Sequence, residues 1–202
     1  MAETGARPYV MAIVGSPRAN GNTSYLVDAA VNELEQRAVR CEKVMLADYH
    51  ILPCEGHDEC EDLAACPLDD EAAPILEKMY AADGLILATP VYYEDVSGQM
   101  KVFIDRNCFN NYHEIWLKAK TVGLIAVAES TGLDETVDSL RRFVSLSSNT
   151  RLKPLSATGF AYRVGDAAGN EALVASVRRL AREMASALLD PAASGEGPRA
   201  NA

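Results

Sequence analysis

Residues 9–24 read YVMAIVGSPRANGNTS, an apolar segment that passes directly into a polar loop and then into an amphipathic helix. Tyr9–Val14 predicts a buried strand, and apolar residues at helical spacing from Ser24 to Arg40 predict the helix. A loop in this position directs free backbone N–H groups and the positive end of a helix dipole at one point. The sequence therefore predicts an anion site at residues 15–24, above all for a phosphate.

The glycine spacing of this loop excludes two common kinds of nucleotide site. A triphosphate loop places a lysine after its last glycine, but Asn22 follows Gly21 here, and the spacing from Gly15 to Gly21 is one residue too long. A dinucleotide fingerprint needs a close middle glycine that admits the pyrophosphate to the backbone, and this loop has none. The phosphate is therefore neither that of a nucleoside triphosphate nor that of a dinucleotide.

The side chains of the loop indicate which phosphate it suits. The hydroxyls of Ser16, Thr23 and Ser24 and the guanidinium of Arg18 match a terminal monophosphate with several oxygens to satisfy, as in a mononucleotide. The alternative is an ordinary polar turn in which Thr23 or Asn22 caps the helix. The loop by itself leaves both interpretations open.

The composition restricts the class of protein. The chain has 202 residues, 49% of them hydrophobic, which predicts a single domain over residues 1–190 with a sizeable core. A net charge of -10 argues against nucleic acid as a partner. The sequence carries neither a secretion signal nor an apolar run that could cross a bilayer, so we expect a cytoplasmic protein. Pro191–Ala202 is small, polar and rich in glycine and proline, which predicts a disordered tail.

Strands and helices alternate along the chain. The predicted strands are 9–14, 43–47, 84–88, 121–128 and 155–162, and the predicted helices are 24–40, 74–82, 97–106, 133–146 and 171–189. This alternation predicts an α/β fold with a doubly wound parallel sheet and helices on both of its faces. Because ligands bind outside the carboxyl ends of the strands in such a sheet, we expect the loops after the first, third and fourth strands to converge.

Two of these loops carry features suited to a planar ligand. Pro90 fixes the exit of the third strand, and the rings of Tyr92 and Tyr93 offer a flat surface beside it. The alternative is that both tyrosines cap the core. Ser130-Thr131-Gly132 follows the fourth strand, and its glycine permits close approach of a ligand. Ser97 is the predicted N-cap of the helix that begins there.

Seven short motifs follow one another along Tyr9–Tyr162. They are GSPR at 15–18, GNT at 21–23, DD at 69–70, ADG at 82–84, TPVY at 89–92, SGQMK at 97–101 and IDR at 104–106. This ordered series resembles the flavodoxin-like NAD(P)H-dependent FMN reductases, and more narrowly their iron-sulfur flavoprotein branch. The resemblance implies a five-stranded parallel sheet with the order 2-1-3-4-5, bound FMN, and NAD(P)H as the reductant.

The resemblance also implies roles for the loop residues. Those implied to hold the FMN phosphate are Ser16, Arg18, Asn22, Thr23 and Ser24; those implied to border the isoalloxazine ring are Pro90, Val91, Tyr92 and Tyr93, with Ser130, Thr131 and Gly132 near its far edge. No catalytic side chain is implied, because the flavin carries the chemistry from NAD(P)H to a small-molecule or protein acceptor. Such flavin sites are commonly completed by a second subunit, which implies a homodimer or a dimer of dimers.

Four potential metal ligands lie close together between the second strand and the next helix, namely Cys54, His57, Cys60 and Cys66. Five cysteines, three of them in one loop, indicate metal or redox chemistry in a reducing compartment. Iron-sulfur flavoproteins carry four cysteines here for a [4Fe-4S] cluster, whereas His57 stands at the second position. A cluster with one histidine ligand, a zinc ion and no metal at all stay open as interpretations. Cys41 and Cys108 are predicted to be small apolar residues outside the site.

Two alternative functions stay open. One is an electron-transfer relay with no small-molecule substrate of its own, and the other is a flavoenzyme recruited to a metabolite-tailoring redox step. Residues 108–116, CFNNYHEIW, are unusually aromatic for a connection and indicate either a partner contact or a cover for the sheet edge. The sequence does not identify the electron acceptor.

Overall fold

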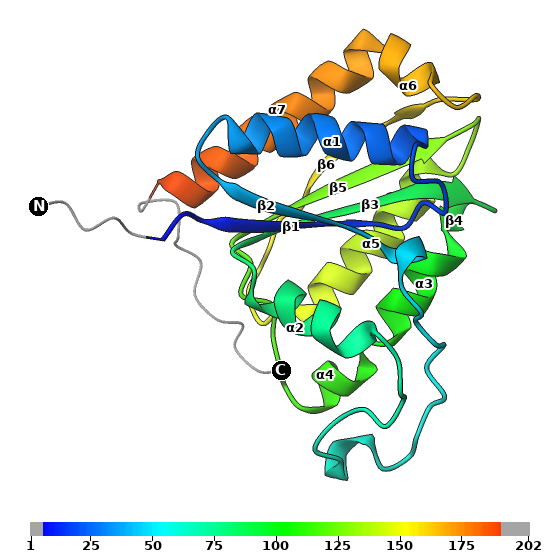
Figure 1. The fold of residues 1–202 in the computed structure, drawn as a ribbon, viewed down its shortest axis with the longest axis vertical. Coiled ribbons are helices and arrows are strands. Elements are labelled where there is room, and N and C mark those ends of the chain that lie inside the picture. Colours follow the sequence, from blue (N-terminus) through cyan, green and yellow to red (C-terminus); the bar gives the residue numbers. More distant parts are fainter. Residues whose placement is uncertain (1–5, 191–202) are drawn as a thin grey trace, which may run out of the picture.

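The computed structural model of the protein describes residues 6–190, which form one sheet with helices on both faces (Figure 1). Its parallel strands lie in the order β2-β1-β3-β5-β6. The predicted flavodoxin-like α/β fold is confirmed. The short strand β4 lies off this path, and when the five parallel strands are numbered without it their order is the predicted 2-1-3-4-5. The predicted disordered tail at 191–202 lies outside the described residues.

The elements follow the alternation that the hydrophobic pattern predicts. The strands are β1 (Tyr9–Val14), β2 (Arg40–Met45), β3 (Gly84–Tyr92), β4 (Asp95–Val96), β5 (Thr121–Ala128) and β6 (Leu155–Phe160). The helices are α1 (Asn22–Glu35), α2 (Ala72–Ala81), α3 (Gly98–Asp105), α4 (Cys108–Tyr112), α5 (Leu133–Ser147), α6 (Asp166–Gly169) and α7 (Glu171–Leu189), with 3₁₀ helices η1 (Leu46–Asp48) and η2 (Cys60–Asp62). The bounds of β1, β5 and α7 match the prediction to the residue.

The short strand β4 was not predicted and adds a hairpin at the end of β3. It pairs antiparallel with β3, Val91 opposite Val96. The connecting residues Tyr93 and Glu94 have positive φ angles of 51° and 60°. Tight hairpin turns of this kind are usually marked by Asn-Gly or Asp-Gly, and Tyr-Glu gives no such signal. The sequence therefore does not predict the hairpin, although the hairpin forms the end of the strand that borders the predicted ligand.

Some boundaries differ from the predicted ones for local reasons. Helix α1 ends at Glu35 instead of Arg40, because the chain reverses through Ala38 at a φ of 61°. The Arg40 N–H then donates to the Pro8 carbonyl at 2.8 Å, which starts β2 earlier than predicted. Helices α4 and α6 have five and four residues, too few for a helical hydrophobic period to be recognised.

Two apolar layers fix the sheet between its helices. Along β1, Met11 and Ile13 pack with α2, α3 and α5 on one face, while Val10, Ala12 and Val14 pack with α1 and α7 on the other. Figure 1 shows these two groups of helices on opposite sides of the sheet. This frame holds the carboxyl ends of β1, β3 and β5 side by side at one edge.

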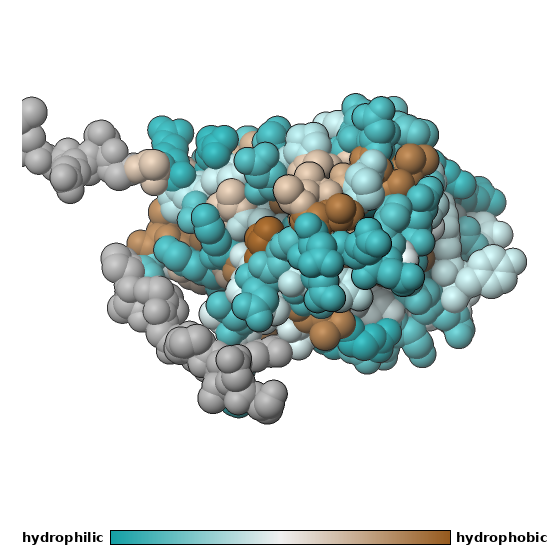
Figure 2. Space-filling view, turned by 90° about the horizontal axis from the view of Figure 1, so that it is seen from below, coloured by the Kyte–Doolittle hydropathy of each residue, from teal (hydrophilic) through white to brown (hydrophobic). Residues whose placement is uncertain are grey.

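The surface of the protein is mainly polar where it can be seen. Figure 2 looks from below Figure 1 and shows a largely hydrophilic face with small, separate hydrophobic patches. Among residues 6–190, no helix combines the length and the apolar character needed to cross a membrane.

Candidate functional site

The loop between β1 and α1 leaves the start of helix α1 open. Gly21 caps the helix without any side-chain hydrogen bond, and the first intrahelical bond joins the Tyr25 N–H to the Gly21 carbonyl at 3.0 Å. Within the described residues, the backbone N–H groups of residues 22–24 have no acceptor. Several free donors and the positive end of a helix dipole thus point to one place, which fits an anion.

Three side chains of this loop lie beside those N–H groups. The Ser16 hydroxyl, 4% exposed, accepts a hydrogen bond from the Arg18 N–H at 3.1 Å, and this turn sets the course of the loop. The Arg18 guanidinium is exposed and has no ion pair among residues 6–190. Thr23 is 2% exposed and lines the cavity described below, and no hydrogen bond of its hydroxyl is found in the described part of the chain.

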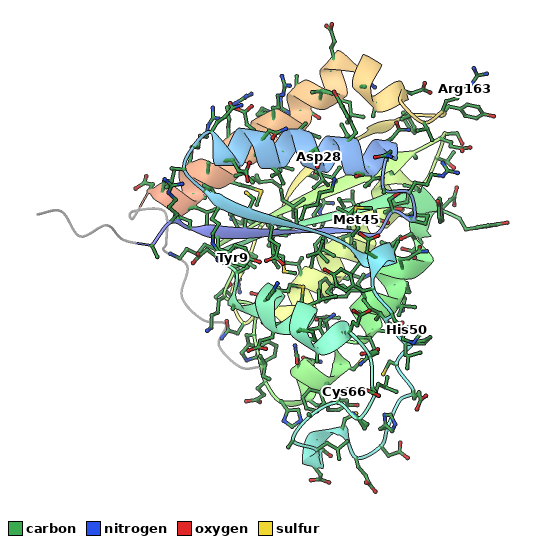
Figure 3. The ribbon with its side chains drawn as sticks, viewed as in Figure 1. Tyr9, Asp28, Met45, His50, Cys66 and Arg163 are labelled. Atoms are coloured by element: carbon green, nitrogen blue, oxygen red, sulfur yellow. The ribbon has the colours of Figure 1, made fainter. Side chains whose placement is uncertain are left out.

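Asn22 uses its side chain elsewhere. Its Nδ2 donates to the Arg163 carbonyl at 2.8 Å, and its Oδ1 accepts from the N–H groups of Gly165 and Ala167 at 3.0 and 3.2 Å. These bonds tie the start of α1 to the loop after β6, where Figure 3 labels Arg163. Asn22 lines the cavity, and it keeps its backbone N–H and one of its two Nδ2 hydrogens for the phosphate that it was predicted to hold.

Ser24 is engaged in the same way. Its hydroxyl accepts from the Lys43 ammonium at 2.7 Å, and the same ammonium pairs with Asp28 at 2.6 Å. The side chain thus belongs to the contact between α1 and β2, and Ser24 is absent from the lining of the cavity. Of the five predicted phosphate residues, four line the cavity, namely Ser16, Arg18, Asn22 and Thr23.

The β3–β4 hairpin presents the two predicted tyrosines. Tyr92 is 42% exposed and Tyr93 is completely exposed, on a turn whose two residues both have positive φ. Non-glycine residues in this region are strained and concentrate at functional sites. The interpretation that these tyrosines cap the core is therefore wrong, since both rings stand at the surface beside the cavity.

A buried serine locks the first two loops together. Ser97, fully buried, donates from its hydroxyl to the Gly15 carbonyl at 2.5 Å and accepts from the Met100 N–H at 3.3 Å as the N-cap of α3. The Ser97 N–H in turn donates to the Thr89 hydroxyl at 3.0 Å. The predicted cap is confirmed, and it also positions the β1–α1 loop, a role that the sequence did not show.

The third loop closes the site from the β5 side. Ser130 and Thr131 line the cavity, and Gly132 follows as the N-cap of α5 with a φ of 82°. A Cβ on Gly132 would lie 2.6 Å from the Cα of Glu94 and 2.8 Å from Val91. This glycine is therefore needed because the hairpin packs directly against it.

The three loops surround one cavity of about 440 Å³, within the size range of small-molecule and cofactor sites. Its lining includes ten of the predicted flavin residues, namely Ser16, Arg18, Asn22, Thr23, Pro90, Val91, Tyr92, Tyr93, Ser130 and Thr131. The structure adds Glu94, Val127, Ala128, Glu129, Ala161 and Tyr162, which sequence reasoning missed. Tyr162, 70% exposed, follows β6, and its only sequence signal was an aromatic residue at the carboxyl end of the last strand.

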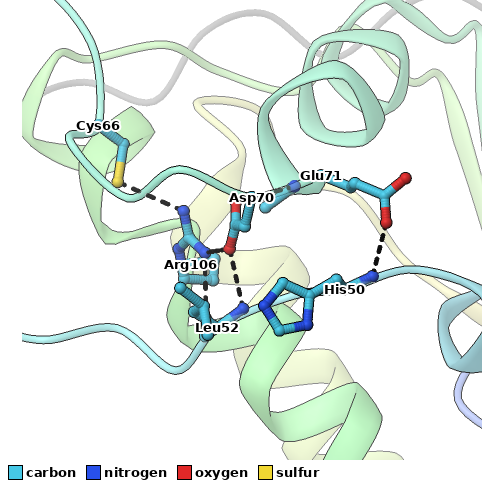
Figure 4. A network of polar contacts seen from close by, with 7 residues as sticks. His50, Leu52, Cys66, Asp70, Glu71 and Arg106 are labelled. Carbon is cyan, nitrogen blue, oxygen red and sulfur yellow. Dashed lines mark hydrogen bonds and ion pairs between the residues drawn. The ribbon is translucent and has the colours of Figure 1, made fainter.

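The cysteine loop, residues 49–71, is anchored by a buried ion pair. Arg106 and Asp70 form a salt bridge with side chains 2% and 1% exposed (Figure 4). Arg106 also donates to the Leu52 carbonyl at 3.0 Å, and Asp70 accepts from the N–H groups of Leu52 and Ala72 at 2.8 and 3.0 Å. Burial alone would raise the pKa of the Asp70 carboxyl, but the guanidinium and the two N–H groups outweigh it and hold that pKa below its usual value.

The cysteines of the loop surround the start of α4. The Cys66 thiol accepts from the Arg106 guanidinium at 3.4 Å, and the carbonyl of the buried Cys60 lies 3.0 Å from the His113 ring nitrogen. Burial raises the pKa of the Cys108 thiol, and the nearby Cys54 raises it further. Cys108 is an exposed free thiol at the start of α4, and its assignment outside the site stays a prediction.

His57 lies apart from these thiols. Its Nε2 is 3.5 Å from the Glu55 carboxylate two residues earlier. Within the described residues, no three His, Cys, Asp or Glu side chains are arranged as a metal site. The structure thus places Cys54, Cys60 and Cys66 around α4 and does not bring His57 among them.

Comparison with known proteins fixes the family. The model of the NADPH-dependent FMN reductase family matches residues 8–162. This chain belongs to that family. It is 33% identical over 184 residues to an iron-sulfur flavoprotein of Methanocaldococcus jannaschii, covering 87% of this chain and 95% of the relative, and 30% identical over 139 residues to one of Methanosarcina thermophila, covering 68% and 73%.

Solved structures share the fold at low identity. An NADH:FMN oxidoreductase in its apo form superposes with a TM-score of 0.66 at 18% identity, covering 93% of this chain and 94% of that one. An NAD(P)H:quinone oxidoreductase from Methanothermobacter marburgensis gives 0.70 at 16%, covering 89% and 98%. The predicted resemblance is confirmed, and this member of the FMN reductase family is an NAD(P)H-dependent FMN oxidoreductase.

Proposed function

We propose that the 440 Å³ cavity is where this oxidoreductase holds FMN and reduces it with NAD(P)H. The observation that carries the proposal is the meeting of three loops around one cavity, with an uncapped helix start at one end and exposed tyrosines at the other. The free N–H groups at residues 22–24 fit a monophosphate, whose oxygens need several donors. The residues present thus fit the group that the family binds.

Each end of the cavity has its own task. Thr23 offers a hydroxyl donor to the phosphate and Arg18 offers charge, Ser16 shapes the loop by donating to the Arg18 carbonyl at 3.3 Å, and Tyr92 and Tyr93 border the ring. Ser97 fixes the phosphate loop relative to the start of α3, because its hydroxyl joins the two. FMN held between these residues would supply the redox chemistry, taking hydride from the nicotinamide and passing electrons to the acceptor. We expect ping-pong kinetics, with both substrates using the exposed side of the cavity in turn.

Arg18→Ala should weaken FMN binding about tenfold, because the variant loses one charge-assisted contact to the phosphate. The measurement is a fluorescence titration of the apoprotein with FMN. Arg178→Ala is the matched control, since Arg178 is exposed on α7 and does not line the cavity. Equal dissociation constants for Arg18→Ala and the wild type would place the phosphate elsewhere.

A second copy of the chain completes the open side of this site. Tyr93 is completely exposed at the tip of the hairpin, and Tyr92, Phe160 and Tyr162 are 42%, 52% and 70% exposed nearby. Aromatic side chains of this kind are enriched in protein interfaces. Light scattering of the FMN-loaded protein should give the mass of a dimer or a dimer of dimers. A monomer at micromolar concentration would contradict this assembly.

The electrons leave to a small-molecule or protein acceptor, and the cysteine loop favours an iron-sulfur cluster on that route. Two relatives carry the name iron-sulfur flavoprotein, and Cys66 and Cys60 of this loop contact Arg106 and His113, which flank α4. Thiolates are the usual ligands of such clusters. The five cysteines are free thiols, the state that the cytoplasm maintains. An anaerobic spectrum titrated with NADPH tests this: bleaching of the flavin band supports the function, and a protein that takes up no FMN refutes it.

A further inference from the structure

We propose that the chain has a second binding site, which takes a nucleoside phosphate with two or more negative charges. The site is a cavity of about 870 Å³ between the segments that lead into β5 and β6, lined by residues 116–121, 149–153 and 155 and by two residues of α7. We call it the basic cavity. The flavin cavity lies at the carboxyl ends of the same strands (Figure 1). The eight residues of β5 separate the two cavities by about 26 Å at the usual rise of a strand. The second site therefore does not depend on the proposed function.

The lining of the basic cavity is strongly positive. Its cations are Lys118, Lys120, Arg151 and Lys153. Among the described lining residues there is one carboxylate, that of Glu183, which lies 3.9 Å from Arg179. Within residues 6–190, Lys118, Lys120 and Arg151 form no ion pair with another side chain. The whole chain carries 29 acidic and 19 basic residues, so this concentration of unpaired positive charge is local, and it favours a polyanion.

The first two cations extend from a segment whose backbone is fixed. Leu117 and Ala119 are each 4% exposed and pack into the core, whereas Lys118 and Lys120, which alternate with them, are exposed. The N–H groups of Lys118 and Lys120 donate to carbonyls at the end of α2 and just before β3, at 3.2 and 2.8 Å. The two ammonium groups are therefore positioned before a ligand arrives, which lowers the entropic cost of binding.

The other two cations follow the same alternation before β6. Leu152 packs against the core, while its neighbours Arg151 and Lys153 are exposed. The turn that precedes them is fixed by Ser148, 3% exposed, whose hydroxyl accepts from the Thr150 N–H at 3.2 Å. Because β5 and β6 are parallel neighbours, the segments that lead into them bring both pairs of cations to one cavity.

The uncharged lining residues favour a ring beside the phosphates. Trp116, the only tryptophan of the chain, is half-buried at the cavity, and an indole offers a flat face on which a planar base stacks. Asn149 is exposed and offers a donor and an acceptor for the edge of a base. The guanidinium of Arg151 matches a phosphate with two parallel N–H bonds. Together with a volume typical of small-molecule sites, these groups favour a nucleoside phosphate over a simple inorganic anion.

The same cations could instead serve the helices. The carbonyl of Ser147, at the end of α5, accepts from the Leu117 N–H at 2.9 Å, and the carbonyl of Tyr80, near the end of α2, accepts from Lys118. Cations beside the carboxyl ends of helices stabilise them through the helix dipole. That role needs no ligand, so neutralising a cation would lower only the stability. A nucleotide site requires in addition a loss of binding.

The test is a titration of the FMN-loaded protein with ADP, because bound FMN occupies the phosphate site at the other end of the sheet. Calorimetry measures the affinity, and the fluorescence of Trp116 reports whether the ligand enters the basic cavity. We expect ADP to bind with a dissociation constant below about 1 mM. Adenosine, which lacks the charges, should bind at least tenfold more weakly than ADP, and inorganic pyrophosphate, which lacks the ring, at least fivefold more weakly.

Variants locate the bound ADP. The double variant Lys118→Ala/Lys120→Ala and the single variant Arg151→Ala should each weaken ADP binding at least tenfold, and Arg151→Lys should recover part of the loss. Arg178→Ala is the matched control, since Arg178 is exposed on α7 and lines neither cavity. FMN content and urea unfolding of every variant separate a loss of stability from a loss of binding.

Three results would overturn the second site: no binding of ADP below about 1 mM, adenosine bound as tightly as ADP, or cavity variants that bind ADP like Arg178→Ala. The last result would leave these cations with the stabilisation of helix ends alone. A chain that takes up no FMN refutes the proposed function instead. The ADP titration is then made on the apoprotein, where the same variants decide.

Discussion

Replacing Asp70 by alanine should lower the free energy of unfolding by about 3–5 kcal/mol, because it leaves the Arg106 guanidinium buried without its partner. The guanidinium is 2% exposed, and Asp70 also accepts the N–H groups of Leu52 and Ala72. Urea unfolding followed by circular dichroism measures the loss. Asp69→Ala is the control, since Asp69 is the exposed neighbour and makes no ion pair in the described part of the chain.

The same ion pair should give the stability a distinct dependence on pH. The pKa of Asp70 lies below its ordinary value of 3.8 in the folded state, so the carboxylate stabilises the fold at higher pH. This contribution is complete above the unfolded pKa, near 4, and is lost as the pH falls through the lower, folded pKa. The difference in unfolding free energy between wild type and Asp70→Asn should therefore be constant from pH 7 to 5 and shrink below pH 4. A difference that grows on acidification would contradict this assignment.

Helix α3 connects the flavin cavity and the cysteine loop. Ser97 at its start bonds to the Gly15 carbonyl of the phosphate loop, and Arg106 just after its end bonds to the cysteine loop. Its eight residues correspond to about 12 Å at the usual rise of a helix. A rigid element of this length holds the flavin cavity and the cysteine loop at a fixed separation. Asp70→Ala should therefore disturb the cysteine loop first, and the flavin cavity only through α3.

The sequence predicts the arrangement of the flavin loops because it follows from the sheet. Carboxyl ends of parallel strands meet at one edge, so the loops after β1, β3 and β5 converge once the alternation of strands and helices is recognised. The side chains of Asn22 and Ser24 could not be placed in this way. The partner of Asn22 is Arg163, 141 residues away, and that of Ser24 is Lys43. Contacts of such range leave no local pattern in the chain.

The cysteine loop is a second region where the sequence alone does not predict which side chains meet. The four ligands predicted from the compact motif include His57, because spacing along the chain was the only guide to proximity. Cys108 comes from the five-residue helix α4, which is too short to be recognised from hydrophobic period. The cysteine loop is fastened near this helix by the bonds of Arg106 to Leu52 and Cys66. Only the folded chain reveals that neighbourhood.

Gly132→Ala should damage both the fold and the flavin cavity. Gly132 has a φ of 82°, and an added Cβ would stand 2.6 Å from the Cα of Glu94, a backbone atom that cannot move alone. Strain at positive φ and overpacking together should lower the free energy of unfolding by about 2–5 kcal/mol. The hairpin that carries Tyr92 and Tyr93 must shift, so we also expect FMN affinity to fall at least tenfold.

Gly165→Ala separates the two causes. Gly165 has a φ of 98°, but no atom of residues 6–190 lies within 4 Å of its added Cβ, so the variant carries the backbone strain without the collision. It should lose only about 1–2 kcal/mol of unfolding free energy. Unfolding curves and FMN titrations of both variants give the comparison. If Gly132→Ala lost no more stability than Gly165→Ala and bound FMN like the wild type, the hairpin would not rest on Gly132, and the cavity would owe its shape to the β1–α1 loop alone.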